Sequence, residues 1–328
     1  MHIQKVALIG AGGIGSYLIW GFSSLPKEDF IIIADGKRGD KLRENGIVIN
    51  GELYHLNVKT AEEAGKVDLI FATTKYGSLP QVLPLIQKLT GENTIVMSLM
   101  NGVDSEELIA ETIGKKHVVS SLLRIAAQRR VNSNGPDTVD FNIPQGIRGL
   151  YYGKEDPLTE RGKVQLEALS ELFSRSRLLT HLSHTIISDI WAKYLFNIGQ
   201  NIPQAIIGCG AGAYGDSEHL CWMKEQLEEE VIAVAKAKGV IMNASILEPG
   251  KKGKGAGYTA AESPAVRHST LQDLDAHRHT EIEMLCGRMV KMGHALGVPT
   301  PYNAFAYHVI KALEEKNDGK FNYETKLK

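Results

Sequence analysis

Three polar side chains recur at intervals of four residues along an otherwise apolar stretch, Asp189–Asn201. They are Lys193, Asn197 and Asn201. In a helix this spacing places all three on one face, and Pro203 is expected to end the helix soon afterwards. An amine beside two amides can protonate and orient a small polar ligand, so we interpret this face as one wall of a binding cleft. The alternative is a helix end where the lysine reaches water and the asparagines cap neighbouring backbone.

A second chemical pattern lies in Pro264–Leu296, which we predict to be one helix. Its apolar face is interrupted by Arg278 and Glu281, and Ser269 stands near its start. A carboxylate on a buried face is costly unless it is paired, and Lys193 is the partner that we expect. An ion pair between Glu281 and Arg278 is the alternative.

The elements that position these groups begin with a nucleotide-binding pattern. A short apolar strand leads into a glycine-rich turn, and a helical segment follows. In this context the first glycine permits a tight turn, the second lets a pyrophosphate approach the backbone, and the third lets the helix pack closely on the strand. A glycine-rich turn without a ligand is the alternative. The residues expected to bind the dinucleotide are Gly10, Gly12, Gly13, Ile14 and Gly15.

The choice of dinucleotide depends on the residues after the second predicted strand, Phe30–Ala34. Asp35 can accept hydrogen bonds from both ribose hydroxyls of NAD(H), and its charge repels a 2′-phosphate. Lys37 and Arg38 follow at once, and both could hold the 2′-phosphate of NADP(H). Asp35 inclines the prediction toward NAD(H), and NADP(H) stays open.

Two further strands, Val67–Ala72 and Thr94–Leu99, carry polar residues at their carboxyl ends. Lys75 follows the first strand and Asn101 follows the second. Ligands of open α/β sheets bind at this edge, so both residues are expected beside the cofactor. The alternative is that both are ordinary turn residues.

These patterns predict a two-domain chain. Residues 1–183 are expected to form a doubly wound Rossmann-type α/β domain, whose sheet Gly149–Gly153 extends, and residues 184–328 an all-α domain. Pro249–Gly257 is rich in glycine and lysine and is expected to be a mobile loop that could cover a cleft. The predicted helices of the second domain, besides Pro264–Leu296, are Thr185–Gln200, Ser217–Lys238 and Tyr302–Lys316.

Composition excludes several classes of partner. The net charge of −1 over 328 residues argues against nucleic-acid binding through bulk charge, and no apolar run is long enough to span a membrane. The strand begins almost at the first residue, which leaves no room for a signal peptide and favours the cytoplasm. His277 and His279 would diverge on a helix, so no metal site is expected.

Taken together, the motifs resemble the ketopantoate reductases (2-dehydropantoate 2-reductases) over nearly the whole chain. The most specific likeness is the pair of patterns Trp191-x-Lys193-x-x-x-Asn197-x-x-x-Asn201 and Ser269-x-x-Gln-Asp-x-x-x-x-x-x-Thr-Glu281-Ile, in this order. The Thr-Thr-Lys75 turn, Asn101-Gly102 and Pro299-Thr-Pro-Tyr-Asn303 add to it. The glycine motif is shared by many dehydrogenases.

The resemblance implies a Rossmann domain followed by a helical domain like the C-terminal domain of 6-phosphogluconate dehydrogenase. It implies reduction of ketopantoate to pantoate for coenzyme A synthesis by hydride transfer from NADPH. By resemblance, Lys193 is the general acid, Glu281 its acidic partner, and Asn197, Asn201 and Ser269 bind the substrate. The resemblance also implies that Lys75 and Asn101 help to hold the nicotinamide side of the cofactor and the substrate. A homodimer through the helical half is expected by resemblance alone. Asp35 departs from the family, which commonly has a basic residue there.

Other readings stay open at this point. The chain could reduce another small 2-oxo acid, or it could be a β-hydroxyacid or opine-type dehydrogenase. The glycine-rich substrate motif of the β-hydroxyacid class is not evident around Ser120–Ile125. A protein that senses NAD(H) without turnover is a reading from a different class, but it would not need Lys193 as a proton donor.

Overall fold

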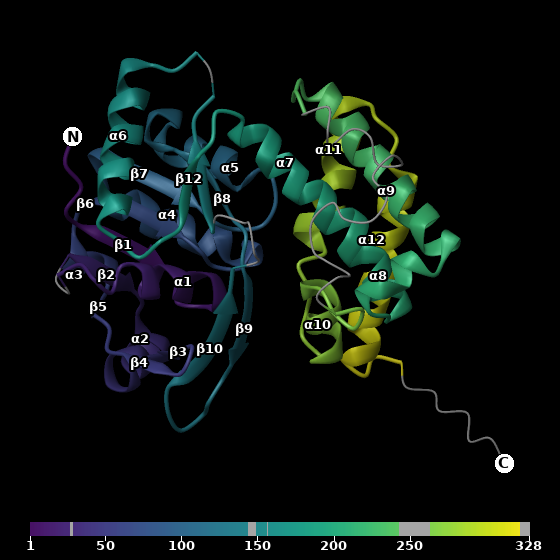
Figure 1. The fold of residues 1–328 in the computed structure, drawn as a ribbon, viewed down its shortest axis with the longest axis horizontal. Helices are drawn as coiled ribbons and strands as arrows, with labels where there is room; N and C mark the ends of the chain where they lie inside the picture. The colour runs from purple at the N-terminus through teal and green to yellow at the C-terminus, as the bar shows by residue number, and fades with distance from the viewer. Residues whose placement is uncertain (27–28, 144–148, 156, 243–262, 322–328) are drawn as a thin grey trace. The chain divides into compact units, whose positions relative to one another are not determined.

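The chain divides into two units in the computed structural model, Met1–Ile187 and Ser188–Lys328. The structure describes residues 1–26, 29–143, 149–155, 157–242 and 263–321, so the predicted loop Pro249–Gly257 lies outside the described residues. Each unit is described by itself below (Figure 1).

A five-stranded parallel sheet in the order β5-β2-β1-β6-β7 forms the centre of the first unit. The chain moves outward from β1 in one direction through β2 and in the other through β6, so the strand order reverses between β1 and β6. Ligands of open α/β sheets bind at such a switch point, beyond the carboxyl ends of the strands. The strands are β1 (Val6–Ile9), β2 (Phe30–Ile33), β5 (Val58–Lys59), β6 (Val67–Ala72) and β7 (Thr90–Ser98).

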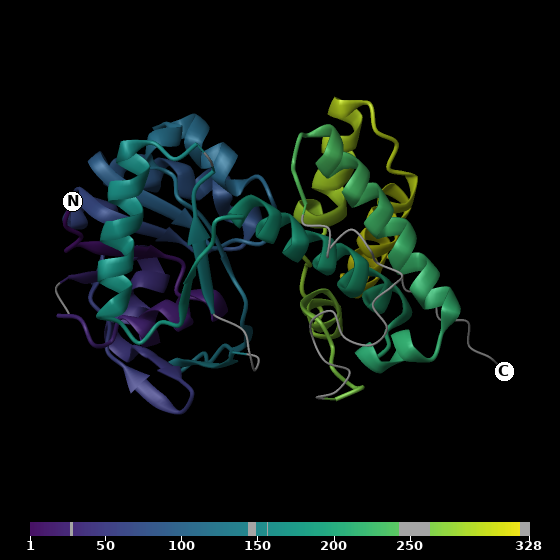
Figure 2. The same ribbon diagram turned by 45° about the horizontal axis from the view of Figure 1, so that its top comes forward.

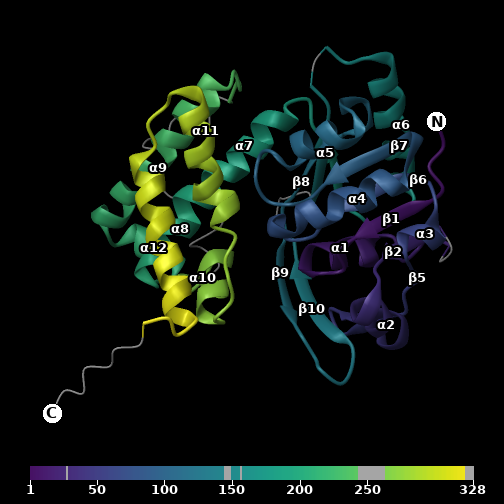
Figure 3. The same ribbon diagram turned by 180° about the vertical axis from the view of Figure 1, so that it is seen from behind.

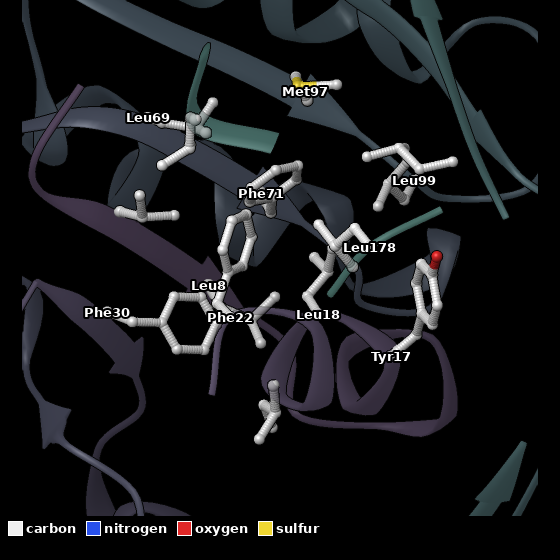
Figure 4. Close-up of a cluster of buried hydrophobic side chains, with 14 of the residues drawn as sticks. Leu8, Tyr17, Leu18, Phe22, Phe30, Leu69, Phe71, Met97, Leu99 and Leu178 are labelled. Carbon is white, nitrogen blue, oxygen red and sulfur yellow. The ribbon is translucent and has the colours of Figure 1, made fainter. Parts of the chain in front are cut away.

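Both faces of this sheet are covered because alternate residues of each apolar strand point to opposite sides. Leu8 and Phe71 pack with the residues of α1 and α6, whereas Ala7 and Ile70 pack with those of α3, α4 and α5. Figure 4 shows the first of these clusters, in which the ring of Phe22, directly after α1, lies 5.8 Å from that of Phe71. The sheet is therefore doubly wound (Figure 2). The helices are α1 (Gly13–Gly21), α2 (Gly36–Asn45), α3 (Ala61–Ala64), α4 (Leu79–Leu89), α5 (Ser105–Ile113) and α6 (Glu160–Ser174).

Two smaller sheets flank the parallel one. In the four-stranded sheet, ordered β4-β3-β10-β9, the β9–β10 hairpin packs against α1 (Figure 3). In the three-stranded sheet, β11 pairs with β12 and β8. The strands are β3 (Ile47–Ile49), β4 (Glu52–Tyr54), β8 (Ser120–Leu123), β9 (Ala126–Arg130), β10 (Asp137–Asn142), β11 (Leu150–Gly153) and β12 (Thr180–Leu182).

The prediction that Gly149–Gly153 extends the parallel sheet is wrong. At the β7 edge, the described residues form one isolated bridge, between Val96 and Val118. The strand β11 instead pairs antiparallel with β8, which satisfies its backbone within the three-stranded sheet.

The second unit is helical throughout its described part. It contains two π-helical turns, Asn197–Asn201 and Glu283–Gly287, which pack against each other. Ser217 caps α9 by accepting a hydrogen bond from the backbone N–H of Leu220. The helices are α7 (Ile186–Phe196), α8 (Ile202–Ile207), α9 (Glu218–Ala237), α10 (Ser269–Asp275), α11 (Arg288–Leu296) and α12 (Pro301–Asn317), and Ala211–Gly215 is a short 3₁₀ segment. The first unit contains the 3₁₀ segments Tyr76–Ser78 and Lys115–His117.

Pro203 does not end the helix of the polar stripe, contrary to the prediction. The π turn Asn197–Asn201 joins α7 directly to α8, and Pro203 lies in the first turn of α8. A proline removes one backbone donor, so carbonyl groups one turn earlier need another partner. The Tyr214 hydroxyl lies 3.4 Å from the carbonyl oxygen of Gly199, the residue four positions before Pro203, and it also donates to the carbonyl oxygen of Gln200 at 2.6 Å. The polar stripe therefore continues along one uninterrupted helical segment, the rod formed by α7, the π turn and α8.

The stretch Pro264–Leu296 is not one helix, and its predicted polar residues do not share one helical face. The helix α10 ends with His277 in the left-handed region, at φ 50°. The backbone N–H of Arg278 then donates to the carbonyl of Asp273 at 2.8 Å, which is the Schellman arrangement of a helix end. The guanidinium of Arg278 also pairs with the Asp273 carboxylate at 2.8 Å.

Candidate functional site

The glycine-rich turn after β1 is shaped by close backbone contacts. Gly10 has φ 109°, and a Cβ added there would lie 2.8 Å from the backbone nitrogen of Thr74. A Cβ added to Gly15 would lie 2.1 Å from the carbonyl oxygen of Gly10. A Cβ on Gly12, by contrast, would meet none of the described atoms within 4 Å. The turn thus leaves space at the glycine where a pyrophosphate is expected.

Two polar features beside this turn also fit a phosphate group. The helix α1 begins at Gly13 with Gly12 as its N-cap, which supplies no side-chain acceptor for the first N–H groups. The buried hydroxyl oxygen of Thr74 has no hydrogen-bond partner among the described residues. Backbone N–H groups at a helix start together with a buried hydroxyl can bind the phosphates of a dinucleotide.

The predicted ribose-binding residues follow β2. Asp35 is exposed and is the N-cap of α2. Arg38 donates one hydrogen bond to the carboxylate of Asp137 at 2.7 Å and another to the carbonyl of Ala11 at 2.8 Å. Lys75 is exposed at the carboxyl end of β6. Asp35 therefore faces solvent, while Arg38 is bound to the protein itself.

A buried polar cluster lies just after Asn101, which is itself half-buried after β7. The hydroxyl of Ser105 lies 2.8 Å from that of Ser98 and donates to the carboxylate of Glu106 at 2.9 Å. Burial raises the pKa of Glu106 to about 7, and the nearby charge of Asp104 adds to the effect. Ser98 and Ser105 lie on either side of Asn101 in the chain, and their hydrogen bonds connect this segment to the Glu106 carboxyl group, whose pKa is about 7.

We expect Glu106 to make stability depend on pH. Its pKa rises from 4.5 to about 7 on folding, so the folded state binds the extra proton. The stabilisation is complete below about pH 4.5 and is lost as the pH rises through about 7, which amounts to about 3 kcal/mol. The variant Glu106→Gln should therefore exceed the wild type in free energy of unfolding at about pH 8 but not at about pH 5.

Urea unfolding at both pH values tests this expectation. Glu111→Gln, at an exposed position of the same helix, is the matched control and should change stability equally at both. An equal effect of Glu106→Gln at both pH values would contradict the role given to Glu106.

In the second unit, the rod formed by α7, its π turn and α8 carries the polar stripe. Lys193 and Asn197 are half-buried, and Asn201 is 4% exposed. The side-chain amide of Asn201 donates to the amide oxygen of Asn197 at 3.5 Å. The amide oxygen of Asn201 is buried and has no hydrogen-bond partner among the described residues. Leaving a buried acceptor unsatisfied costs about 1–3 kcal/mol, so this oxygen is suited to a ligand donor.

Tyr194 joins α7 to the segment after Glu281. Its hydroxyl donates to the carbonyl oxygens of Met284 at 3.1 Å and Leu285 at 2.7 Å, in the second π turn. Since Tyr194 follows Lys193 directly, this contact holds the two segments together in the protein interior. The structure thus brings the stripe and the Glu281 segment onto two elements in contact.

The residue Ser269 is placed by Gln204, which is fully buried on α8. The side chain of Gln204 donates to the carbonyl of Val266 at 3.0 Å and accepts from the backbone N–H of His268 at 2.7 Å. These bonds fix the chain immediately before Ser269, the exposed first residue of α10. As α10 also packs on the first π turn, Ser269 begins a helix that adjoins the stripe.

Glu281 is half-buried. It lies in the segment between α10 and the second π turn, and α12 holds this segment in place. The carboxylate of Glu314, only 2% exposed, accepts from both the backbone N–H and the hydroxyl of Thr280 at 2.7 Å. Lys311 pairs with the same carboxylate at 2.8 Å, and together these contacts lower the pKa of Glu314 despite its burial. The carboxylate of Glu314 therefore stays charged and fixes Thr280, the residue directly before Glu281.

The motif Pro299–Asn303 has a structural role in the described residues. The carboxylate of Glu230 accepts from the backbone N–H groups of Tyr302 at 2.8 Å and Asn303 at 2.9 Å, and from the side chain of Asn303 at 2.7 Å. A carboxylate at this position satisfies the free N–H groups at the start of α12.

The predicted site residues fall into two groups. The glycine turn, Asp35, Arg38, Lys75 and Asn101 belong to the first unit, and the other predicted residues to the second. Sequence reasoning missed Gln204, although it stands three residues beyond Asn201 on the same stripe, because Pro203 was taken as a helix end. It also missed Asp137, which no local pattern marks.

Metal-binding clusters and membrane-spanning helices are both absent from the described part of the chain. No group of three or more His, Cys, Asp or Glu side chains there could hold a metal ion. No helix there is long and apolar enough to cross a membrane.

Comparison with known proteins gives consistent results. The family model described as Ketopantoate reductase PanE/ApbA matches residues 6–141, and its C-terminal counterpart matches residues 185–314. The chain is 26% identical over 319 residues to the 2-dehydropantoate 2-reductase of Streptococcus pyogenes serotype M1, covering 94% of this chain and 97% of that protein.

Two solved structures share the fold. One is a PanE/ApbA family ketopantoate reductase from Ralstonia eutropha JMP134, with a TM-score of 0.76, 23% identity, and coverage of 96% of this chain and 99% of the other. The other is a ternary structure of D-mandelate dehydrogenase with NADH and anilino(oxo)acetate, with a TM-score of 0.78, 23% identity and the same coverage. At this identity the likeness concerns the fold.

Proposed function

The chain belongs to the ketopantoate reductase family, and from this premise we propose that it reduces the 2-oxo group of ketopantoate to the hydroxyl of pantoate. Family membership implies a nicotinamide cofactor and an oxidoreductase reaction. The identity of the substrate and the preferred dinucleotide are the parts that we propose.

The observation that carries the proposal is the buried oxygen of Asn201 that lacks a partner among the described residues. Ketopantoate carries a hydroxyl group on its side chain, and a hydroxyl is a donor that this oxygen can accept from. Asn197 lies one turn away on the same face, and Gln204 fixes the backbone before Ser269. A site built to bind a substrate hydroxyl discriminates strongly against a substrate that lacks it.

Lys193 is the proton donor in this proposal. A reduced nicotinamide supplies the hydride to the carbonyl carbon. Negative charge then develops on the carbonyl oxygen, where an ammonium group stabilises it and donates a proton to give the hydroxyl. Half-burial of Lys193 strengthens this interaction, because screening by water is weaker there.

Glu281 is the acidic partner in the proposal. A carboxylate near an amine favours the protonated form of the amine, which is the form that Lys193 needs. The contacts of Tyr194 with the second π turn and of Glu314 with Thr280 support a fixed position for Glu281.

NADH is the cofactor that we propose. Asp35 lies between β2 and α2 and is exposed. Its carboxylate can accept hydrogen bonds from the ribose hydroxyls. Arg38, one of the two residues that could hold a 2′-phosphate, is bound to Asp137 and to the backbone of Ala11.

Steady-state oxidation of NADH and of NADPH, followed by nicotinamide absorbance, tests the proposal. Ketopantoate is compared with 2-oxoisovalerate, which lacks only the hydroxymethyl group, and with pyruvate. We expect kcat/KM for ketopantoate to exceed that for 2-oxoisovalerate by at least about 10²-fold. Equal rates would assign the chain to another 2-oxo acid, a reading that the shared fold of D-mandelate dehydrogenase favours.

A further inference from the structure

A buried carboxylate in the first unit gathers three cationic side chains. Asp137, at the start of β10, has a side chain that is 1% exposed. It accepts from Arg38 at 2.7 Å, from Lys41 at 2.5 Å and from Arg129 at 2.5 Å. These contacts hold the pKa of Asp137 well below its usual range. Two guanidinium groups and an amine around one anion also describe how proteins bind phosphate.

This cluster adjoins the predicted dinucleotide site. Arg38 lies three residues after Asp35 in the first turn of α2 and also donates to the carbonyl of Ala11 in the glycine turn. In dinucleotide-binding folds the adenosine ribose lies at the end of the second strand, and a nearby arginine accommodates a 2′-phosphate. Here that arginine already has an anion, supplied by the protein.

We propose that Asp137 sets the cofactor preference by occupying, with its own carboxylate, the cations that would otherwise bind the 2′-phosphate of NADPH. The inference deepens the proposed function and rests on its nicotinamide cofactor. Both oxygens of Asp137 are saturated, since Oδ1 accepts from Lys41 and from the backbone of Asn132, and Oδ2 from both arginines. A 2′-phosphate would have to break these charge-assisted bonds while it approached Asp35.

The competing explanation is that the cluster only fastens the β9–β10 hairpin to α2. Arg129 lies on β9, Asp137 on β10, and Arg38 and Lys41 on α2, so the contacts do join these elements. A fastening role predicts that loss of the carboxylate lowers stability and weakens both dinucleotides in proportion. A selective role predicts a change in the ratio of the two affinities.

The experiment measures dissociation constants of NADH and NADPH by fluorescence titration, without substrate. We expect the wild type to bind NADH more tightly, and Asp137→Asn to lower the ratio Kd(NADPH)/Kd(NADH) by at least about tenfold, because three cations become available. Asp140→Asn is the matched control, since Asp140 is a half-exposed acid on the same strand, paired with Arg130, and should leave the ratio unchanged. Adenosine 2′,5′-bisphosphate, which carries the same 2′-phosphate as NADPH, should also compete with NADH more strongly for Asp137→Asn than for the wild type.

A second variant decides the matter if Asp137→Asn does not fold. Under the proposal Arg38 does not contact the phosphate in the wild type, so Arg38→Gln should change the ratio by less than about threefold. A large rise in the ratio for Arg38→Gln, an unchanged ratio for folded Asp137→Asn, or tighter NADPH binding by the wild type would each overturn the proposal. Because no substrate is present, loss of the proposed reductase activity leaves this result intact, whereas a wild type that binds neither dinucleotide overturns both.

Discussion

Replacing Lys193 with alanine is expected to lower kcat for ketopantoate reduction by about 10²–10⁴-fold, the range for a lost general acid. The proton and the positive charge are both needed only as the carbonyl oxygen gains charge, so the loss should appear in kcat more than in KM. Cofactor affinity should stay within about threefold of the wild type, since the predicted dinucleotide-binding residues lie in the other unit. Steady-state kinetics together with fluorescence titration of NADH measure both quantities.

Two further variants separate the roles of charge and proton. Lys193→Arg keeps the positive charge but holds its proton too tightly to donate it, so it should recover only a minor part of the loss. Lys291→Ala, at an exposed position of α11, is the matched control for removal of a lysine and should behave as the wild type. Turnover of Lys193→Ala near the wild-type rate would remove Lys193 from the mechanism.

The parts of the fold that sequence predicted well are those set by local constraints. The turn from Gly10 to Gly15 is one example, because φ 109° at Gly10 and the close approach at Gly15 each demand glycine wherever the turn occurs. The doubly wound sheet is another, since continuous apolar strands such as Val67–Ala72 require cover on both faces. Both follow from a few adjacent residues.

The parts that sequence could not predict depend on partners far along the chain. The helix α10 ends at Asp275, with His277 in the left-handed position where glycine is the usual signal, and the next segment is held by Glu314, which lies 34 residues from Thr280. The helix of the stripe passes Pro203, and the carbonyl groups of Gly199 and Gln200 beside it accept from the hydroxyl of Tyr214, which lies beyond the stretch. The spacing of apolar and polar residues within either stretch does not indicate these distant contacts.

The cofactor site shows the same limit. The position of Arg38 after the second strand indicates a phosphate ligand when read alone, but its partner Asp137 lies 99 residues away. The competition between an internal carboxylate and an external phosphate is therefore visible only in the folded chain.

Asn201→Leu is expected to have opposite effects on stability and on function. Leucine has the same number of side-chain heavy atoms in the same branched arrangement and removes a buried acceptor that lacks a partner among the described residues, so the free energy of unfolding should stay the same or rise by about 1 kcal/mol. The kcat/KM for ketopantoate should fall by about 10²-fold, the loss that follows from one buried hydrogen bond to the substrate. The value for 2-oxoisovalerate should change much less, because that substrate has no hydroxyl to donate.

The comparison of the two substrates makes this prediction specific to the proposed role. Gln200→Leu, in the same π turn but off the polar stripe, is the matched control and should leave the preference between the substrates unchanged. A purely structural amide at position 201 would give the reverse pattern, with a loss of more than about 2 kcal/mol in stability and an equal fall for both substrates. Urea unfolding and paired kinetic assays therefore decide between a residue that holds the fold and one that holds the substrate, because only the second is kept at a cost to stability.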